Sequence, residues 1–268
     1  MSEQQDVIGD LEATVVLAGV RWAYRSATTR TVETYSEADG HDAAWLGNTR
    51  FTLFRDRLDR VFTCCRYAQR VGSNITANLD LLYSELTELD ISAMPQLAPS
   101  LVRRADLNGS PGWASQGRRF LLASCAFGKL DRLPWPQKSP TKQRVARQPD
   151  PAPSQGTLFD GLADDEFAGL IALATATHQL DMETFVVAHT LDPFSQSMEL
   201  IFGRPRLNSG GGDAWHWYQD LLVVPPSDAG RRVDDTPSPQ SPDAAPDAPV
   251  RLRRPPSERP GSQASGTT

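Results

Sequence analysis

Cysteine is scarce in this chain of 268 residues, which contains only three. Two of them, Cys64 and Cys65, are adjacent, so the cysteines cannot form a disulfide framework, and this indicates a reducing compartment. The chain also lacks a basic leader, and its longest uncharged apolar runs, 13–20 and 167–177, are far shorter than the roughly 20 residues needed to cross a bilayer. These absences predict a cytoplasmic protein with no membrane partner.

The short motifs of common enzymes are missing as well. No G-x-S-x-G, H-E-x-x-H, C-x-x-C or H-x-E pattern occurs, and the fragment Gly128-Lys129 lacks the remaining positions of a phosphate-binding P-loop. The sequence therefore identifies neither a catalytic nucleophile nor a resident metal or cofactor. We expect a binding or regulatory protein rather than an enzyme.

Charge is unevenly distributed along the chain, although the net charge is only −6. Residues 1–43 carry 3 basic and 8 acidic side chains, residues 44–148 carry 16 and 8, residues 149–224 carry 2 and 11, and the last 44 residues carry 6 of each. A net charge of +8 over 44–148 therefore lies between two acidic segments. This pattern predicts contact with a polyanion or an acidic protein.

Proline divides the chain. Six prolines between residues 133 and 156 argue against a helix or a central strand there, and ten more lie in the last 44 residues, where almost no side chain can form a core. We expect an α+β protein with a mainly helical region at 1–132, a Pro-rich basic linker at 133–156, a small hairpin-plus-helix α+β region at 157–224 and a disordered tail at 225–268.

Hydrophobic periodicity predicts the individual elements. Apolar residues at three- and four-residue steps predict helices over 7–27, 43–67 (with Asp42 as N-cap), 77–86 and 118–127. Runs of β-forming residues predict strands over 184–191 and 198–207, joined by a turn at 192–195. Asp213 is a good N-cap for a helix over 214–222, and the apolar run at 167–175 fits a buried strand or a short helix.

Contact with nucleic acid would rest on the basic residues of 44–148. On the helix predicted from Ala43, a wheel of about 100° per residue places three arginines along one flank, where they can follow a phosphate backbone. Trp113 and Trp135 offer rings for base stacking, although lone tryptophans more often belong to a core. The candidate contact residues are Arg50, Arg57, Arg60, Arg103, Arg104, Lys138, Lys142, Arg144 and Arg147.

The histidines suggest a different chemistry, because each of the four lies within three positions of an aspartate. Imidazole and carboxylate groups together bind divalent metals or form an acid–base pair. The best catalytic set is His189, Asp192, Asp213 and His216, which the predicted hairpin and the following loop would bring together. Aspartate is common in this chain, so solvated or turn-forming His and Asp residues explain the same pattern.

A glycine-rich loop at 210–212 precedes a predicted helix, and a helix N-terminus attracts anions. Gly211 and Gly212, with Arg204 and Arg206 just upstream, therefore form a candidate anion site. Asp213 places a negative charge where the anion would lie, so a capped chain reversal is the simpler interpretation.

Together these features predict a cytoplasmic binding or regulatory protein that contacts nucleic acid or an acidic protein through residues 44–148. The alternative is a small metal- or phosphate-dependent hydrolase that uses the C-terminal His and Asp residues and the loop Gly210–Gly212.

Overall fold

The computed structural model describes residues 2–68, 75–149 and 180–223, which belong to one compact unit, Met1–Pro225. Helices predominate in its first part and a six-stranded sheet in its second, so the predicted α+β class is confirmed. The predicted tail at 225–268 and the apolar run at 167–175 lie outside the described residues. No helix in the described ranges has both the length and the apolar character needed to span a membrane.

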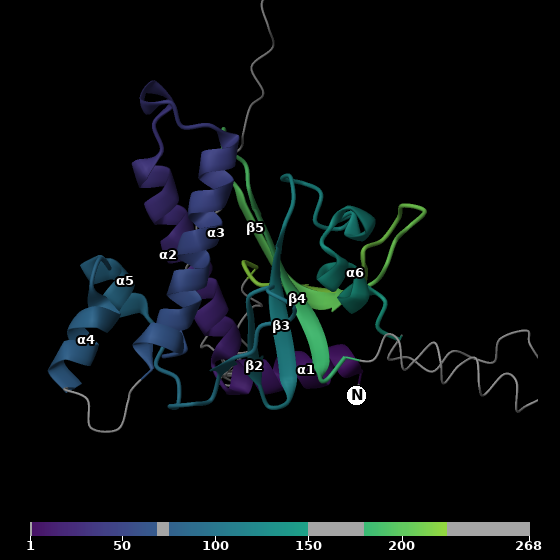
Figure 1. Ribbon diagram of the computed structural model, residues 1–268, viewed down its shortest axis with the longest axis horizontal. Helices are drawn as coiled ribbons and strands as arrows, with labels where there is room; N and C mark the ends of the chain where they lie inside the picture. Colours follow the sequence, from purple (N-terminus) through teal and green to yellow (C-terminus); the bar gives the residue numbers. More distant parts are fainter. Residues whose placement is uncertain (1, 69–74, 150–179, 224–268) are drawn as a thin grey trace, which may run out of the picture. The chain divides into compact units, whose positions relative to one another are not determined.

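Three longer helices form one layer of the fold (Figure 1). α1 (Glu3–Ala13) begins with a capping box, and α3 (Ala43–Val61) begins at the predicted N-cap, where Asp42 accepts a hydrogen bond of 2.7 Å from the Trp45 N–H. α2 (Val16–Thr34) lies along α3 (Figure 1). The shorter helices are η1 (Glu37–Asp39), η2 (Cys65–Tyr67), α4 (Ile75–Tyr83), α5 (Glu88–Ala93), η3 (Trp135–Gln137) and α6 (Pro140–Ala146).

The single helix predicted over 7–27 is in fact two helices. Val15, between α1 and α2, adopts a left-handed φ of 63°, which is unusual for a β-branched residue. Neither glycine nor proline marks this break, so the sequence gives no local signal for it. The change of direction lets α1 reach the far strands, where Glu3 pairs with Arg204 and accepts the indole N–H of Trp217 at 2.5 Å.

The sheet has the strand order β1-β2-β3-β4-β5-β6, and every neighbouring pair is antiparallel except β3 and β4. Its strands are β1 (Arg103–Arg104), β2 (Gly112–Ser115), β3 (Arg118–Ser124), β4 (Glu183–Leu191), β5 (Met198–Pro205) and β6 (Trp215–Asp220). The predicted hairpin of 184–191 and 198–207 is thus confirmed. In the parallel pair, Ser124 is level with His189, so both strands end at the same edge of the sheet.

Different layers cover the two faces of the sheet (Figure 1). On one face, Phe120, Phe185 and Phe202 pack in a core with side chains of α1, α2 and α3. On the other face, side chains of η3 and α6, such as Trp135 and Val145, complete a second core. The sheet is therefore enclosed between a large helical layer and a small one.

Several predicted elements were wrong, for identifiable reasons. The helix predicted over 118–127 is β3, whose interior is buried on both faces, so apolar spacing does not distinguish a strand from a buried helix there. The helix predicted over 214–222 is β6, since its aromatic residues pair with β5. A helix also occurs within 133–156, because Pro140 occupies the first turn of α6, where its missing N–H leaves no hydrogen bond unmade. α3 ends at Val61, earlier than predicted.

Candidate functional site

The three arginines predicted to form a surface row on α3 are buried. Arg50, Arg57 and Arg60 are only 5%, 3% and 2% exposed. Their wheel positions are indeed similar, but that side of α3 faces the protein. They therefore cannot track a phosphate backbone as a surface row.

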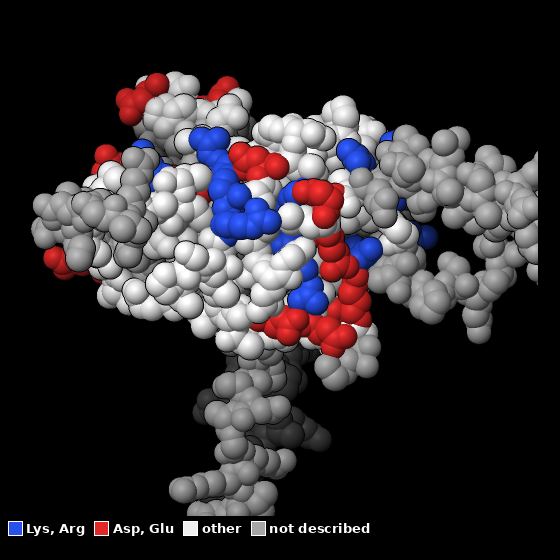
Figure 2. All heavy atoms as spheres, turned by 60° about the horizontal axis from the view of Figure 1, so that its bottom comes forward, with Lys and Arg blue, Asp and Glu red and all other residues white. Residues whose placement is uncertain are grey.

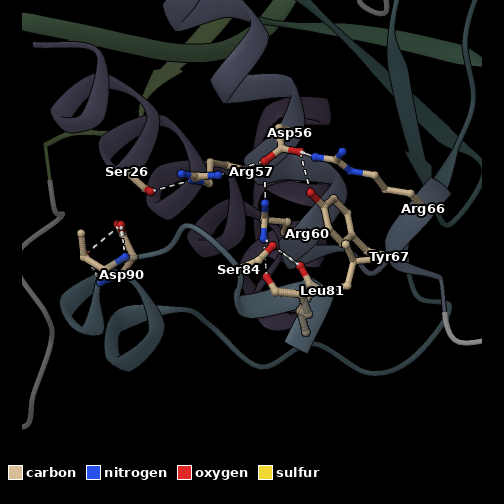
Figure 3. Close-up of polar contacts among 11 residues, drawn as sticks. Ser26, Asp56, Arg57, Arg60, Arg66, Tyr67, Leu81, Ser84 and Asp90 are labelled. Atoms are coloured by element: carbon tan, nitrogen blue, oxygen red, sulfur yellow. Dashed lines mark hydrogen bonds and ion pairs between the residues drawn. The ribbon is translucent and has the colours of Figure 1, made fainter. Parts of the chain in front are cut away.

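Arg57 and Arg60 belong to an ion-pair network centred on Asp56 (Figure 3). The Asp56 carboxylate accepts hydrogen bonds from Arg57 at 2.9 Å and from Arg60 at 2.8 Å, and Arg66 and Tyr67 occupy its other oxygen. The remaining acceptors of the two buried arginines are Ser26 Oγ for Arg57 and the carbonyls of Leu81 and Leu82 for Arg60. We call these residues the Asp56 network.

Hydrogen bonding dominates the electrostatics of the Asp56 network. Burial alone would raise the pKa of Asp56, but hydrogen bonds from Arg60, Tyr67 and Arg66, with the charge of Arg60, bring that pKa below its usual value. Burial and the bond to Asp56 raise the pKa of Tyr67 to about 12. No buried donor of Arg57 or Arg60 is left without an acceptor, and the network ties α3 to the segments that follow it.

Other basic residues of 44–148 are neutralised by acidic residues from several parts of the chain. Arg104 pairs with Asp59 at 2.7 Å and with Asp106 at 2.5 Å, and Arg118 pairs with Asp10 at 2.6 Å. Figure 2 shows basic and acidic side chains adjoining one another on one face of the molecule. Folding therefore pairs several cations of this segment, and Arg118 and Arg119 pair with acidic residues outside it.

A few basic residues keep no carboxylate partner within the described ranges. Lys138 donates to the Ser124 carbonyl at 2.6 Å, while Lys142, Arg103 and Arg147 form no ion pair there. Arg144 on α6 is half-buried and is not counted among these residues. No acidic residue occurs between positions 132 and 150.

Arg206 joins these residues in space. The Leu207 N–H donates to the Ala146 carbonyl at 2.8 Å, which holds the end of β5 against the end of α6. Arg147 and Arg206, each next to a residue of this bond, are both exposed, and Arg206 forms no ion pair in the described part of the chain. We call Lys138, Lys142, Arg147 and Arg206 the α6 surface.

The structure does not bring the four predicted catalytic residues together. His189 is buried in β4, Asp192 lies in the β4–β5 turn, and Asp213 lies in the loop at the opposite end of β5. His216 is five residues from Leu221, which is level with His189 across β5, so the two histidines are roughly 17 Å apart along the strands. The described residues contain no group of three or more His, Cys, Asp or Glu side chains that could hold a metal ion.

The glycine loop of the predicted anion site is followed by the strand β6 and not by the predicted helix. Gly211 and Gly212, with φ of 85° and 91°, form part of the β5–β6 connection and lead into a strand. Without a helix N-terminus, the loop has no aligned N–H groups for an anion. Arg204 is buried and pairs with Glu3 and Glu183 instead.

Arg50 and His189, which the sequence placed in two different candidate sets, lie in one buried polar cluster. The His189 ring is wholly buried, and its centre lies 5.6 Å from that of Tyr24 and 5.2 Å from that of Phe54. Tyr24 donates its hydroxyl proton to the Thr190 carbonyl at 2.5 Å. Neither nitrogen of His189, nor Nε or Nη1 of Arg50, meets a hydrogen-bond partner among the described residues. We call Tyr24, Arg50 and His189 the Arg50–His189 cluster.

Charged groups of both signs act on this cluster: Arg50, Lys142 and Lys138 on His189, and Glu199 on Tyr24. Burial lowers the pKa of His189 well below its usual value, and Arg50, Lys142 and Lys138 lower it further, so the imidazole is neutral at neutral pH. Burial raises the pKa of Tyr24 to about 12 and, together with Lys138, lowers the pKa of Lys142. The cluster thus offers a guanidinium and neutral polar groups, with two ammonium groups nearby.

Cys125 follows β3 at the same edge of the sheet. Burial raises the pKa of its thiol to about 11, against the opposing influence of Lys138 and Arg50. Burial likewise raises the pKa of Cys64 to about 12. Both groups are thiols at neutral pH, so neither supplies the thiolate that nucleophilic catalysis needs. All three cysteines are free.

Sequence reasoning missed Tyr24 and the pairing of β3 with β4. One signal was available, because Arg50 lies one helical turn from Phe54, a residue of the predicted apolar stripe, and is therefore expected to point inward. The parallel pairing left no comparable signal, because the segment that becomes β3 has a helical spacing.

Two clefts are lined by residues other than those of the Arg50–His189 cluster. One, of about 310 Å³, is lined by Asp131, Glu199 and Asp220 among others, and its carboxylates do not suit an anion. The other, of about 460 Å³, is lined by Leu107, Arg144, Leu180 and Asp181. Neither cleft adds a converging set of catalytic groups.

The chain matches no protein-family model, no curated protein and no solved structure. Function must therefore be inferred from the α6 surface and the Arg50–His189 cluster alone.

Proposed function

We propose that this chain is a cytoplasmic binding protein that contacts the phosphate backbone of a nucleic acid through the α6 surface. The supporting observation is that Lys138, Lys142, Arg147 and Arg206 have no carboxylate partner in the described residues, whereas Arg57, Arg60 and Arg104 are paired. Cations that bind phosphates displace the counterions condensed on the nucleic acid, and this favours association. The free cysteines agree with a reducing compartment.

Duplex nucleic acid suits this surface better than stacked single strands. Trp113 and Trp135, which were considered for base stacking, are wholly buried core residues, and their indole N–H groups donate to Asp59 and to the Ala214 carbonyl. Without these rings, the α6 surface offers only charge, which contacts backbone phosphates but does not distinguish one base from another.

An acidic protein is the second candidate partner. α6 is only seven residues long, so it offers little length for reading base edges in a groove. A surface that recognises charge without bases also matches a cluster of carboxylates. Titration with poly-glutamate beside DNA separates the two candidates.

The proposal is tested by measuring the affinity of the full chain for duplex DNA as a function of salt. Affinity should fall linearly on logarithmic axes. Arg147→Gln combined with Arg206→Gln should weaken binding and reduce the slope by about 2, because each substitution removes one cation that pairs with a phosphate. Fluorescence anisotropy of labelled DNA gives both quantities.

Arg55→Gln is the matched control, because Arg55 is an exposed arginine on α3, far along the chain from α6. It should leave the slope of the salt dependence unchanged. Absence of salt-dependent binding to DNA, or an unchanged slope in the double variant, would contradict the nucleic-acid proposal. Binding to poly-glutamate that the double variant abolishes would then support the acidic protein.

A further inference from the structure

The Arg50–His189 cluster contains buried polar groups that the described residues leave without hydrogen bonds. Nε and Nη1 of Arg50 and both ring nitrogens of His189 are enclosed, and the two residues are 5% and 0% exposed. Proteins almost always satisfy buried polar groups, because an enclosed donor without an acceptor loses its bonds to water and gains nothing in return. The enclosed guanidinium therefore needs an acceptor from outside this set.

Arg50 differs in this respect from its neighbour Arg57, although both are buried on α3. Arg57 donates to Ser26 and pairs with Asp56. Arg50 has no ion pair with any described residue, and the groups whose charge most affects its pKa, after burial itself, are Tyr24 and Cys125. Both of these are neutral at neutral pH. The charge of Arg50 is thus unbalanced where it lies.

The position of the cluster in the sheet also indicates a ligand. His189 is level with Ser124 at the ends of β4 and β3, the one parallel pair in the sheet described here. In open sheets, ligands bind just beyond the carboxyl ends of parallel strands, where loops and helices of both layers converge. At this edge Arg50 comes from the α2/α3 layer, and Lys138, which donates to the Ser124 carbonyl, comes from the η3/α6 layer.

We propose that Arg50 and His189, with Lys138 and Lys142 at the outer side, form a binding site for a phosphoryl group. Arg50 would donate to two of its oxygens, and the neutral His189 ring would donate one N–H to a third. The ligand is either inorganic phosphate or the phosphate monoester of a small molecule. Both present the same tetrahedral, doubly charged group.

Charge favours a phosphoryl group over a carboxylate. Arg50, Lys138 and Lys142 all act on His189, and none of the groups that shift its pKa is acidic. A carboxylate would balance one of these three cations, whereas a phosphate dianion balances two and relieves the repulsion between Lys138 and Lys142.

The site is tested by thermal unfolding of the full chain in increasing concentrations of inorganic phosphate, phenyl phosphate and acetate, at constant ionic strength. Phosphate should raise Tm saturably, because a ligand that binds only the folded state stabilises it. Arg50→Met should abolish this rise, and Lys142→Gln should weaken phosphate binding about tenfold, as expected for one charge-assisted hydrogen bond.

Arg50→Met is expected to fold, because methionine keeps the length of the side chain and removes the enclosed charge. Its Tm without phosphate should equal or exceed that of the unchanged chain, which shows that the loss of binding does not come from unfolding. Circular dichroism verifies the fold. Arg55→Met, an exposed arginine on the same helix, is the matched control and should keep the full response to phosphate.

Each outcome bears on the site. A rise with both phosphate and phenyl phosphate assigns a monoester, and a rise with phosphate alone assigns the free ion. An equal rise with acetate overturns the choice of a phosphoryl group. No rise with phosphate, or the same rise in Arg50→Met, overturns the site itself. The proposed nucleic-acid contact is tested separately, because Arg147→Gln and Arg206→Gln should leave the phosphate response intact.

Discussion

Asp56 and Arg50 lie on the same helix, α3, yet their surroundings differ in a way that matters for function. The Asp56 carboxylate accepts hydrogen bonds from three arginines and a tyrosine, and no buried donor of Arg57 or Arg60 lacks an acceptor. Arg50 is enclosed without a carboxylate, beside a histidine whose nitrogens have no partner in the described residues. The buried donors of Arg57 and Arg60 have acceptors within the protein, whereas the buried donors of Arg50 need an acceptor from outside the described residues. The Asp56 network is a structural element, and the Arg50–His189 cluster is the better candidate for a binding site.

The largest effect should come from breaking the matched network. Asp56→Asn removes the negative charge that Arg57 and Arg60 share, and both arginines stay buried. We expect the free energy of unfolding to fall by about 3 kcal/mol, since a buried charge that loses its partner is strongly destabilising. Urea unfolding of the full chain measures this change.

Glu33→Gln is the control for that experiment. Glu33 pairs with Arg30 at 3.6 Å, and both side chains are about half exposed. Exposed pairs contribute about 0–1 kcal/mol, so this variant should be nearly neutral. If Asp56→Asn were equally mild, the Asp56 network would not be a structural element of the fold.

A smaller effect of opposite sign should follow from Arg50→Met in the absence of any ligand. Because Arg50 has no carboxylate partner to lose, removing its charge relieves the cost of burial, and we expect the free energy of unfolding to rise by about 1 kcal/mol. Arg57→Met should instead lower it. If both variants lowered the free energy of unfolding, the proposed difference between Arg50 and Arg57 would be wrong.

The smallest effect should appear in the pH dependence. The pKa of Asp56 is lowered in the folded protein, so its contribution to stability is complete above the unfolded pKa of about 3.9 and is lost as the pH falls through the folded pKa. The difference in unfolding free energy between the unchanged chain and Asp56→Asn should therefore be constant near neutral pH and shrink below about pH 4. A difference that grew on acidification would contradict the lowered pKa.

The sequence predicted the class of fold, the β4–β5 hairpin and the N-cap of α3, because these depend on local patterns. Asp42 followed by an apolar stripe is a local signal, and so is a pair of β-forming runs around a turn. The nature of β3 and β6 was not predictable in this way. Both segments form strands because they pair with other strands of the sheet. Neither apolar spacing nor a capping residue indicates a pairing partner that is distant in sequence.

Single residues of the candidate site could be predicted from the sequence, but their proximity could not. Arg50 and His189 each stood out in the sequence, one for its charge and one for its neighbouring aspartate, but 139 positions separate them. Their encounter depends on the parallel pairing of β3 with β4 and on α3 covering that face. The charge division along the chain did not show which cations are paired, since pairs such as Arg118 with Asp10 join distant segments.

The break at Val15 has a consequence for how the chain matures. It directs α1 toward β5 and β6, so that Glu3 meets Arg204 and Trp217, and Gln4 donates to the Tyr218 carbonyl. During synthesis α1 can contact α2 early, but its contacts with Arg204, Trp217 and Tyr218 must wait until β5 and β6 have been made. Such distant closure slows folding and leaves apolar surface exposed meanwhile. A nascent chain that stops before β5 would lack the partners of Glu3 and Gln4, so the start of α1 would stay unanchored.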